Sequence, residues 1–577
     1  MTSWKRASGL SLLLSIALAG TVDVSTAQSS DLESTLPGPI FVERAAAVGL
    51  DFVHCNGGSG EFYFPEIAGA GGALFDFDND GDLDAYLAQS GSLGVREVCP
   101  QPPGGRLFRN DLRVDADGSR HLAFVDVTET AGIRTDAYGM GVAAADIDND
   151  GLTDLYLTHY GPNQLFRNNG NGTFEDVTDA AGVGDSRWGT SAAFFDFDRD
   201  GFLDLFVANY VQFDLRENPE CYATSSARDY CGPLTFPPER DVLFRNKGDG
   251  TFEDVSVPSN VANEAATGLG VVTADLNQDG WIDIYVANDG LPNHLWINQK
   301  SGVFSNEALF AGVAINWMGE AEAGMGVDAG DFDGDGDEDL FLSHLTDETN
   351  TLYVNGGNGL FEDRTTPSGL GVVSLPYTGF GAGWLDYDND GWLDLLVVNG
   401  AVRRLDGRTG SHENLFAQPN QLLRNSGVGR FEDVSGRAGE ALSLSEVSRG
   451  AAFGDVDNDG DTDVLVVNNG GPARLLVNEI GNGHHWVGLR LVGEQEHRDL
   501  LGARVDVVTT DGRHLWRRAR ADGSYASAND PRVLVGLGSS DVRTVTVHWP
   551  DGGVEAWDRI PMGRYATLTR GRGRRPE

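Results

Sequence analysis

Basic residues are scarce in this chain. It has 42 Lys and Arg against 87 Asp and Glu, a net charge of −45 over 577 residues. Because nucleic-acid phosphates attract positive charge, this balance argues against a nucleic-acid partner. Long apolar runs are also scarce: after residue 27 no run reaches the ~18 apolar residues of a membrane span. We therefore expect no membrane span.

Several catalytic signatures are missing as well. The sequence has no nucleophile elbow, no H-E-x-x-H zinc helix, no phosphate loop and no dinucleotide fingerprint. The enzyme classes that depend on these motifs are therefore disfavoured, and no catalytic residue is predicted.

The one long apolar stretch lies at the start. Lys5 and Arg6 precede the apolar segment Gly9–Gly20, and the small residues Ser25 to Ala27 follow it. This order is typical of a secretory signal peptide. Residues 1–27 are predicted to be cleaved near Ala27, which places the mature protein outside the cytoplasm, in the periplasm or the extracellular space.

What the chain has in abundance is a nine-residue pattern, D-x-[DN]-x-D-G-x-x-D, which occurs seven times. The copies run over residues 76–84, 146–154, 196–204, 275–283, 331–339, 386–394 and 455–463. Short apolar runs rich in β-branched and aromatic residues flank each copy. An EF-hand would start in the same way, but it needs flanking helices and a Glu at position 12, where the first copy has Leu87.

Oxygen ligands at alternate positions suit one hard cation, and the Gly at position 6 allows a sharp turn. Seven oxygen-rich loops favour calcium over zinc, which prefers Cys and His. The alternative is that Asp, Asn and Gly serve only as turn formers. We predict about seven Ca²⁺ ions, one per loop. The predicted ligands, with position 7 contributing its carbonyl where its side chain is apolar, are Asp76, Asp78, Asp80, Asp82, Asp84, Asp146, Asp148, Asp150, Leu152, Asp154, Asp196, Asp198, Asp200, Phe202, Asp204, Asp275, Asn277, Asp279, Trp281, Asp283, Asp331, Asp333, Asp335, Asp337, Asp339, Asp386, Asp388, Asp390, Trp392, Asp394, Asp455, Asp457, Asp459, Asp461 and Asp463.

Two further signals repeat in step with the loops. An L-x-x-N segment follows each loop, from 107–110 to 475–478, and a Phe that opens a further strand occurs seven times, from Phe41 to Phe431. Each unit therefore contains four strands, and seven such units predict an all-β, seven-bladed β-propeller. Phe41 gives a fourth strand with no preceding blade, while 475–478 gives a third strand with no fourth. The two ends are predicted to complete one shared blade and close the ring.

These repeats resemble the FG-GAP/VCBS repeats of integrin α-subunit propellers. Residues 484–569, with HHWVGLRLVG, GARVDVVTTDGR and GSYASANDPR, resemble the ASPIC/UnbV domain of the cartilage acidic protein family. The resemblance implies a secreted calcium-binding propeller with a role in adhesion or matrix contact. We assign residues 28–480 to the propeller, 481–571 to a C-terminal β-sandwich-like ASPIC/UnbV domain and 572–577 to a basic tail.

Strand direction locates the insertions. If the metal loops join strands 1 and 2 on one face, the connections between strands 2 and 3 lie on the opposite face, which we call the top face. Three of these connections are long, in blades 1, 3 and 6. The four cysteines, Cys55, Cys99, Cys221 and Cys231, belong to the same face. They allow three pairings, of which Cys55 with Cys99 and Cys221 with Cys231 closes local loops; metal ligation and free thiols are alternatives.

The residue five positions beyond the last loop Asp is polar in every blade. Strand alternation makes these residues equivalent, so they are candidates for a ring around the channel mouth. A structural interpretation is that they bond strand ends to neighbouring links. The functional interpretation is a pocket for a glycan or protein ligand. Its candidate residues are His159, Tyr160, Trp188, Asn209, Tyr210, Asn288, Trp317, Glu320, His344 and Asn399.

The sequence thus predicts a non-enzymatic, calcium-stabilised binding or adhesion protein that contacts a protein or glycan on the top face. The alternative is an enzyme that acts on a polysaccharide or a secondary metabolite at the same face. An acid or His pair converging on one top-face cavity would favour the enzyme, and an open polar and aromatic surface would favour binding.

Overall fold

A computed structural model describes residues 39–576, except 95–97, 101–103, 405–413 and 495–497. The predicted signal peptide and its cleavage site lie outside the described residues. Among those described, no helix is both long enough and apolar enough to cross a membrane.

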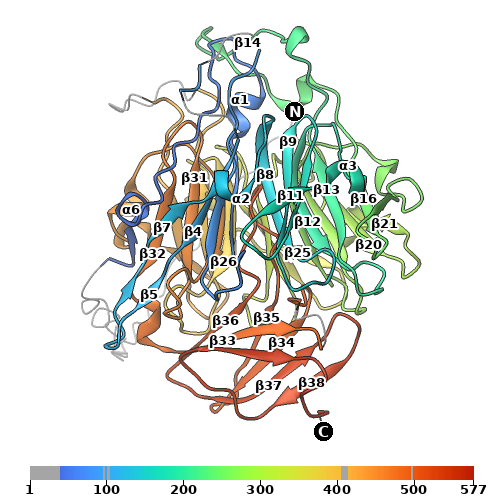
Figure 1. Ribbon diagram of the computed structural model, residues 1–577. Helices are drawn as coiled ribbons and strands as arrows, with labels where there is room; N and C mark the ends of the chain where they lie inside the picture. Colours follow the sequence, from blue (N-terminus) through green and yellow to red (C-terminus); the bar gives the residue numbers. More distant parts are fainter. Residues whose placement is uncertain (1–38, 95–97, 101–103, 405–413, 495–497, 577) are drawn as a thin grey trace, which may run out of the picture. The chain divides into compact units, whose positions relative to one another are not determined.

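The described chain contains seven four-stranded antiparallel sheets that form the blades (Figure 1). From the innermost strand outwards, blade 1 has β2 (Gly72–Phe75), β3 (Asp84–Leu87), β4 (Arg106–Asn110) and β7 (Phe124–Asp126); blade 2 has β8 (Tyr138–Ala145), β9 (Asp154–Tyr160), β10 (Gln164–Asn168) and β11 (Phe174–Asp176); blade 3 has β12 (Gly189–Phe195), β13 (Asp204–Asn209), β16 (Val242–Asn246) and β17 (Phe252–Asp254); blade 4 has β18 (Gly268–Ala274), β19 (Asp283–Asn288), β20 (His294–Asn298) and β21 (Phe304–Asn306). Blade 5 has β22 (Val327–Gly330), β23 (Asp339–Leu342), β24 (Thr351–Asn355) and β25 (Phe361–Asp363); blade 6 has β26 (Gly379–Leu385), β27 (Asp394–Asn399), β28 (Gln421–Asn425) and β29 (Phe431–Asp433); blade 7 has β30 (Ser448–Gly454), β31 (Asp463–Asn468), β32 (Arg474–Asn478) and β1 (Phe41–Glu43).

The ring closes through blade 7. There the N-terminal β1 pairs with β32 in the register Phe41 to Asn478, and β30 contacts β2 of blade 1. This confirms the predicted seven-bladed propeller and the blade shared by both ends. The innermost strands are buried, except at Gly330 at the end of β22, and they are rich in small residues because neighbouring strands converge at the centre. A Cβ at Gly141, for example, would come within 2.4 Å of the Thr190 carbonyl oxygen.

Short elements join the blades. Single-turn helices lie in the links, at α1 (Pro65–Ala68), α2 (Thr128–Ala131), α3 (Thr178–Ala181), α4 (Ala308–Ala311), α5 (Leu370–Ser374) and α6 (Glu440–Ser443). Blades 1 and 3 each contain a small additional hairpin between two of their strands. In blade 1 it is formed by β5 (Arg113–Val114) and β6 (Arg120–His121), and in blade 3 by β14 (Cys221–Tyr222) and β15 (Arg228–Asp229).

The C-terminal strands form two sheets around their own core, consistent with the predicted sandwich. One sheet has the order β36 (Val533–Gly538), β33 (His485–Val492), β39 (Tyr565–Thr569), and the other β35 (His514–Arg518), β34 (Arg504–Thr509), β37 (Val542–His548), β38 (Val554–Trp557). Buried Val487, Val505, Val535 and Val545 belong to the core that both sheets share.

One segment of the C-terminal region leaves these sheets and enters the propeller. Ser524 exchanges two backbone hydrogen bonds with Val327 of β22, at 2.7 and 3.1 Å. The Tyr525 hydroxyl donates to the carbonyl of Ala68 at 3.0 Å. The Ala526 amide donates to Ser191 Oγ at 2.9 Å. Residues 524–528 therefore fill the centre of the ring, where the polar strand ends had predicted a channel mouth.

Candidate metal centres and the opposite face

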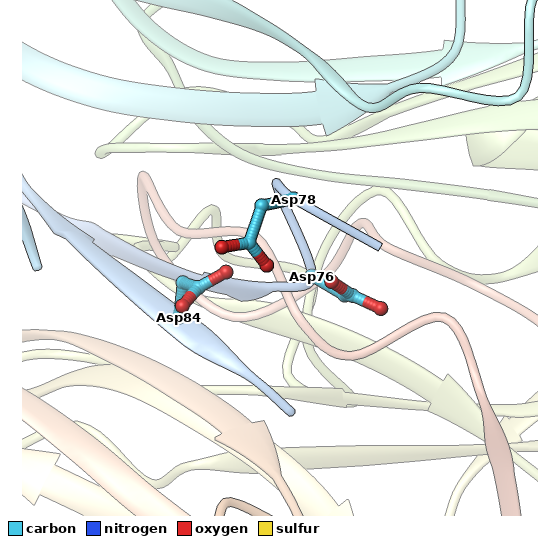
Figure 2. Close-up of side chains that lie close together, drawn as sticks. All are labelled: Asp76, Asp78 and Asp84. Carbon is cyan, nitrogen blue, oxygen red and sulfur yellow. The ribbon is translucent and has the colours of Figure 1, made fainter. Parts of the chain in front are cut away.

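Each metal loop joins the first and second strands of a blade and folds its acidic side chains inward. In loop 2, the Asp146 carboxylate accepts hydrogen bonds from the amides of Asp150 (3.2 Å) and Gly151 (2.8 Å). The position-4 residue Asn149 has a positive φ of 62°, which lets the chain turn back on itself. Carboxylate oxygens from positions 1, 3 and 9 consequently lie within 4.8 Å of one another in at least five loops, as Figure 2 shows for Asp76, Asp78 and Asp84.

The electrostatics of these loops fit a cation. Burial raises the pKa of Asp76 to about 6 and that of Asp84 to about 9, because charged carboxylates are poorly solvated there and repel one another. Buried carboxylate oxygens at position 3, Oδ1 of Asp148 and Oδ1 of Asp457, have no hydrogen-bond partner. A bound cation would ionise the carboxyls and supply the missing partner. The donor set, all oxygen and mostly carboxylate, suits Ca²⁺.

Loop 4 differs from the others. Asn277 replaces the position-3 carboxylate, and its side-chain oxygen accepts a hydrogen bond from the Asp279 amide at 3.0 Å. The ligand cluster of loop 4 therefore carries one negative charge fewer than it would with Asp at position 3. We expect this loop to bind a cation more weakly than the others. The carbonyl ligands predicted at position 7, such as that of Trp281, stay predictions.

The asparagines that end the L-x-x-N segments have a role that the sequence analysis did not assign. The side-chain amide of each donates to the position-2 carbonyl of the metal loop in the preceding blade, at 2.7–2.9 Å. The seven pairs are Asn110–Val456, Asn168–Phe77, Asn246–Ile147, Asn298–Phe197, Asn355–Leu276, Asn425–Phe332 and Asn478–Tyr387. We call these contacts the Asn latches. Because blade 1 is latched to blade 7, the latches run around the whole ring.

The metal loops are also joined directly to one another. Asn79 at position 4 of loop 1 donates to the carbonyl of Gly151 in loop 2 (2.8 Å), and Asn149 donates to that of Gly201 in loop 3 (3.1 Å). Equivalent bonds connect loop 6 to loop 7 and loop 7 to loop 1. These bonds join neighbouring loops directly at four places around the ring.

Arginines of the C-terminal domain contact the same loops. Arg498 donates to the Gly201 carbonyl at 2.7 Å, Arg517 to that of Gly391 at 3.1 Å, and Arg504 to that of Gly336. Burial raises the pKa of the carboxyl at position 1 in every loop, and at each one the charge of a C-terminal arginine opposes that rise. The pairs are Asp76–Arg490, Asp146–Arg498, Asp196–Arg498, Asp275–Arg504, Asp331–Arg517, Asp386–Arg517 and Asp455–Arg532. The C-terminal domain thus covers the metal-loop face with positive charge.

On the top face, the seven polar strand ends follow the structural interpretation. Each side chain bonds to a neighbouring link or connection, and none lines an open channel, because residues 524–528 occupy the centre. The contacts are Gln89–Val53 O, His159–Thr135 Oγ1, Asn209–Arg240 O, Asn288–Pro292 O, His344–Thr349 O, Asn399–Pro419 O and Asn468–Pro472 O. The predicted ring around a channel mouth is therefore not formed.

Two of the predicted aromatic platforms are buried. Trp188 and Tyr210 pack together with ring centroids 5.1 Å apart, and Phe64 covers both at 5.6 and 5.4 Å. Tyr160 is partly buried against Trp188 at 5.5 Å. These rings form the core beneath the blade 3 insertion, so they offer no open surface to a ligand as folded here.

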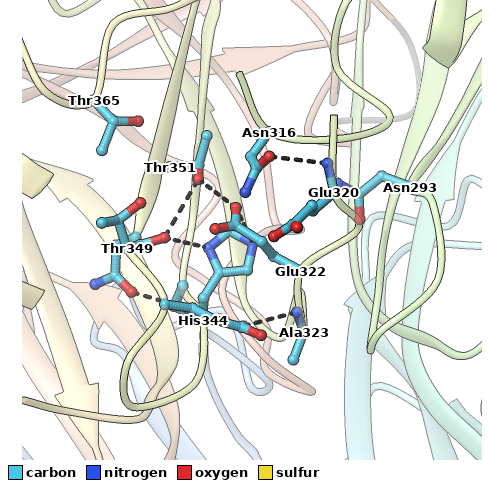
Figure 3. Close-up of polar contacts among 12 residues, drawn as sticks. Asn293, Asn316, Glu320, Glu322, Ala323, His344, Thr349, Thr351 and Thr365 are labelled. Carbon is cyan, nitrogen blue, oxygen red and sulfur yellow. Dashed lines mark hydrogen bonds and ion pairs between the residues drawn. The ribbon is translucent and has the colours of Figure 1, made fainter. Parts of the chain in front are cut away.

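Two other predicted residues, Trp317 and Glu320, remain exposed in the link between blades 4 and 5. Trp317 and Met318 are 72% and 61% exposed. The Asn316 side chain holds their turn by accepting hydrogen bonds from the amides of Met318 and Glu320, both at 3.0 Å. Figure 3 shows Glu320 and Glu322 facing the buried His344. We call the surface formed by Trp317, Met318, Glu320 and Glu322 the Trp317 patch.

Both disulfides lie on the top face. Cys55 pairs with Cys99, and Cys221 pairs with Cys231. The first ties the link that enters blade 1 to the insertion of that blade, and the second closes a loop within the blade 3 insertion. No described cysteine is free.

Comparison with known proteins agrees with this architecture. Residues 76–157, 146–207, 234–286, 275–342 and 331–397 match the FG-GAP-like repeat family, and residues 493–575 match the ASPIC and UnbV family. Cartilage acidic protein 1 of Mus musculus is 28% identical over 84% of this chain and 70% of its own length. Its Homo sapiens counterpart is 27% identical over 84% and 69%.

Among solved structures, an Agrocybe aegerita lectin described as recognising non-reducing terminal N-acetylglucosamine is 16% identical. It covers 68% of this chain and 83% of its own, with a TM-score of 0.36, which is too low to bear on fold or function. The repeats and the domain that follows them decide the assignment: this chain belongs to the FG-GAP-like repeat family and carries an ASPIC and UnbV domain after its repeats.

Proposed function

We propose that the protein is an exported, calcium-stabilised binding module that contacts a protein or glycan through its top face. Export is supported by the two disulfides, which form and persist in oxidising compartments. Calcium is supported by the seven acidic loops and their unpartnered carboxylate oxygens. The homology to cartilage acidic protein 1 supports a binding or matrix role.

The Trp317 patch carries the proposal. Exposing an indole to water is unfavourable, because apolar surface is stabilised by burial. Trp317 is nonetheless 72% exposed, and the hydrogen bond from its amide to the Asp363 carboxylate fixes the turn that presents it. Glu320 is the exposed carboxylate of the patch; the Glu322 side chain is only 10% exposed, and its carboxylate accepts from Thr351 Oγ1 at 3.1 Å. An indole face beside carboxylate acceptors is suited to stacking on a sugar ring while accepting its hydroxyl hydrogen bonds, or to holding a cationic side chain.

The test is a glycan-array and matrix-protein binding screen of the secreted protein, with and without calcium. For any ligand found, Trp317→Ala should weaken binding by at least about tenfold, since aromatic anchors dominate such interfaces. Phe310→Ala is the matched control, because Phe310 is 78% exposed on the same link. If both variants bind like the wild type, the Trp317 patch is not the binding site.

Asp335→Ala separates the two faces. At saturating calcium and with folded protein, this change in a metal loop should leave affinity intact. Loss of binding without unfolding would instead indicate a direct calcium bridge to the ligand and would overturn the top-face proposal.

The enzyme alternative is favoured by one observation. The Tyr210 hydroxyl donates to the buried Asp289 carboxylate, and both line a top-face cavity of about 30 Å³ with Arg403 and Tyr525. Burial raises the pKa of Asp289 to about 6, a useful value for proton transfer near neutral pH. Such a volume holds water and no sugar ring. Turnover of a polysaccharide by the wild type and not by Asp289→Asn would reverse our ranking.

A further inference from the structure

A cavity of about 330 Å³ lies between the metal loops of blades 1 and 2 and the C-terminal domain. This volume is within the range of small-molecule sites, which often occur where domains meet. Its lining includes Phe75 and Ala144 from innermost strands, Leu203 from loop 3 and Leu501 from the C-terminal domain. Each of these four residues is at most 8% exposed. The cavity therefore has an apolar floor that is shielded from bulk water.

Leu501 differs from its neighbour in the direction of its packing. Leu500 belongs to the core that the two C-terminal sheets share, whereas Leu501 packs with residues of blades 2 and 3 such as Leu203. Side chains that line an apolar cavity lack van der Waals contacts on one side, and an apolar ligand supplies them. An apolar cavity of roughly 150 Å³ can already bind a benzene ring. The volume here therefore suffices for a ring with a short chain.

The charged groups of the C-terminal wall are already partnered. Arg490 donates through Nε and Nη2 to the Asp499 carboxylate at 2.8 and 3.1 Å. Arg532 pairs with Asp530 at 2.9 Å, and Arg498 donates to a carbonyl of loop 3 at 2.7 Å. A charged ligand would have to break one of these contacts or bury its charge without a partner, and both are costly.

The metal loops on the opposite wall do not favour a charged ligand either. Asp76 and Asp146 line the cavity from position 1 of loops 1 and 2. Loop 1 holds five Asp and loop 2 holds four, more than the two charges of one Ca²⁺ in each loop can neutralise. This wall therefore repels an anion, while the guanidinium groups of the facing wall repel a cation. Neither sign of charge is selected.

We propose that this cavity binds a small uncharged molecule whose apolar body has the size of a ring with a short chain. The body would pack on the apolar floor, and a neutral polar end would stay at the rim, where the Arg490 side chain is 32% exposed. Because the ligand would contact both the propeller and the C-terminal domain, it would stabilise the packing of one on the other. The site is separate from the Trp317 patch and does not rest on the proposed function.

Calorimetry on the full chain at saturating calcium tests the site with 4-phenylbutanol and two charged analogues, 4-phenylbutyrate and 4-phenylbutylamine. The alcohol should bind at least about tenfold more tightly than either charged compound, because neither charge gains a new partner in the cavity. Leu501→Trp and Leu203→Trp each add an indole from a different wall, and each should abolish binding of the alcohol.

Leu393→Trp is the matched control, because Leu393 occupies the same position in loop 6 as Leu203 in loop 3 and lies outside this cavity. It should bind the alcohol like the wild type, and so should Trp317→Ala, which separates this test from that of the top face. Melting curves in calcium establish which variants are folded, and the comparison of the three probes needs only the wild type.

Three results would each overturn the proposal. The first is a wild type that does not bind the alcohol up to about 10 mM. The second is a charged analogue that binds as tightly as the alcohol. The third is a folded Leu501→Trp or Leu203→Trp variant that binds the alcohol no more weakly than Leu393→Trp does.

Discussion

His54 is a buried side chain whose protonation state affects stability. Its Nδ1 accepts a hydrogen bond from the Gly470 amide at 3.1 Å, and its Nε2 lies 3.0 Å from Ser90 Oγ. Burial, followed by the charge of Arg449, lowers its pKa to about 3. The unfolded chain takes up this proton near pH 6.5, so the folded state loses stability as pH falls from 6.5 towards 3.

Between pH 7 and pH 5 this single residue should cost about 2 kcal/mol of unfolding free energy, at about 1.4 kcal/mol per pH unit. His54→Gln should flatten the pH dependence by that amount, measured by denaturant unfolding in saturating calcium. The exposed His121 provides the control for the loss of a histidine as such, through His121→Gln. Equal slopes for His54→Gln and the wild type would show that His54 is not held neutral.

At the scale of elements, the Asn latches join each third strand to the preceding blade. Asn298 is fully buried, and its amide donates to the Phe197 carbonyl at 2.8 Å. Asn298→Ala would leave that carbonyl without its partner in the interior. We expect a loss of about 2–3 kcal/mol in unfolding free energy. Gln299→Ala, at the exposed neighbouring position, should cost less than about 0.5 kcal/mol.

Chemical denaturation at saturating calcium measures both variants under conditions where the loops are filled. Similar losses for Asn298→Ala and Gln299→Ala would mean that the strand end, rather than the latch, determines the effect.

The elements also show how far the sequence could predict the structure. The blades were predictable because each repeat encodes its own strands and turn, and β1 could be placed because Phe41 matches the other fourth strands. The insertion of residues 524–528 into the ring was not predictable. That segment has no strand periodicity, and its fit depends on the width left by seven sets of inner strands. Trp188 was assigned to the surface because its burial depends on Phe64, which is distant in sequence.

The Arg contacts were missed for a related reason. The residues that flank Arg498 share no motif with those that flank Arg517. The packing of the C-terminal domain on the propeller brings these two arginines to the carbonyls of Gly201 and Gly391. No repeat or spacing in the chain signals that proximity.

At the scale of the whole molecule, calcium is expected to hold the ring together. The latches and position-4 bonds connect neighbouring loops, so a loop emptied of its cation leaves repelling carboxylates against the next blade. A ligand that binds only the folded state stabilises it by mass action, about 4 kcal/mol for one site at a thousandfold excess over Kd. Several linked sites multiply this effect. Chelation should therefore lower the melting temperature steeply.

We predict that dialysed protein retains about seven calcium ions, one for each acidic loop of the sequence, and that loop 4 is the first to empty because Asn277 replaces a carboxylate. Elemental analysis gives the stoichiometry, and scanning calorimetry with and without chelator gives the stabilisation. Added Ca²⁺ should restore the melting temperature where equal Mg²⁺ does not, since Mg²⁺ demands a tighter octahedral shell. Two or fewer bound ions, or a melting temperature that does not change when chelator is added, would contradict this prediction. The Asp-rich loops would then serve only as turns, held by the Asn latches and the C-terminal arginines.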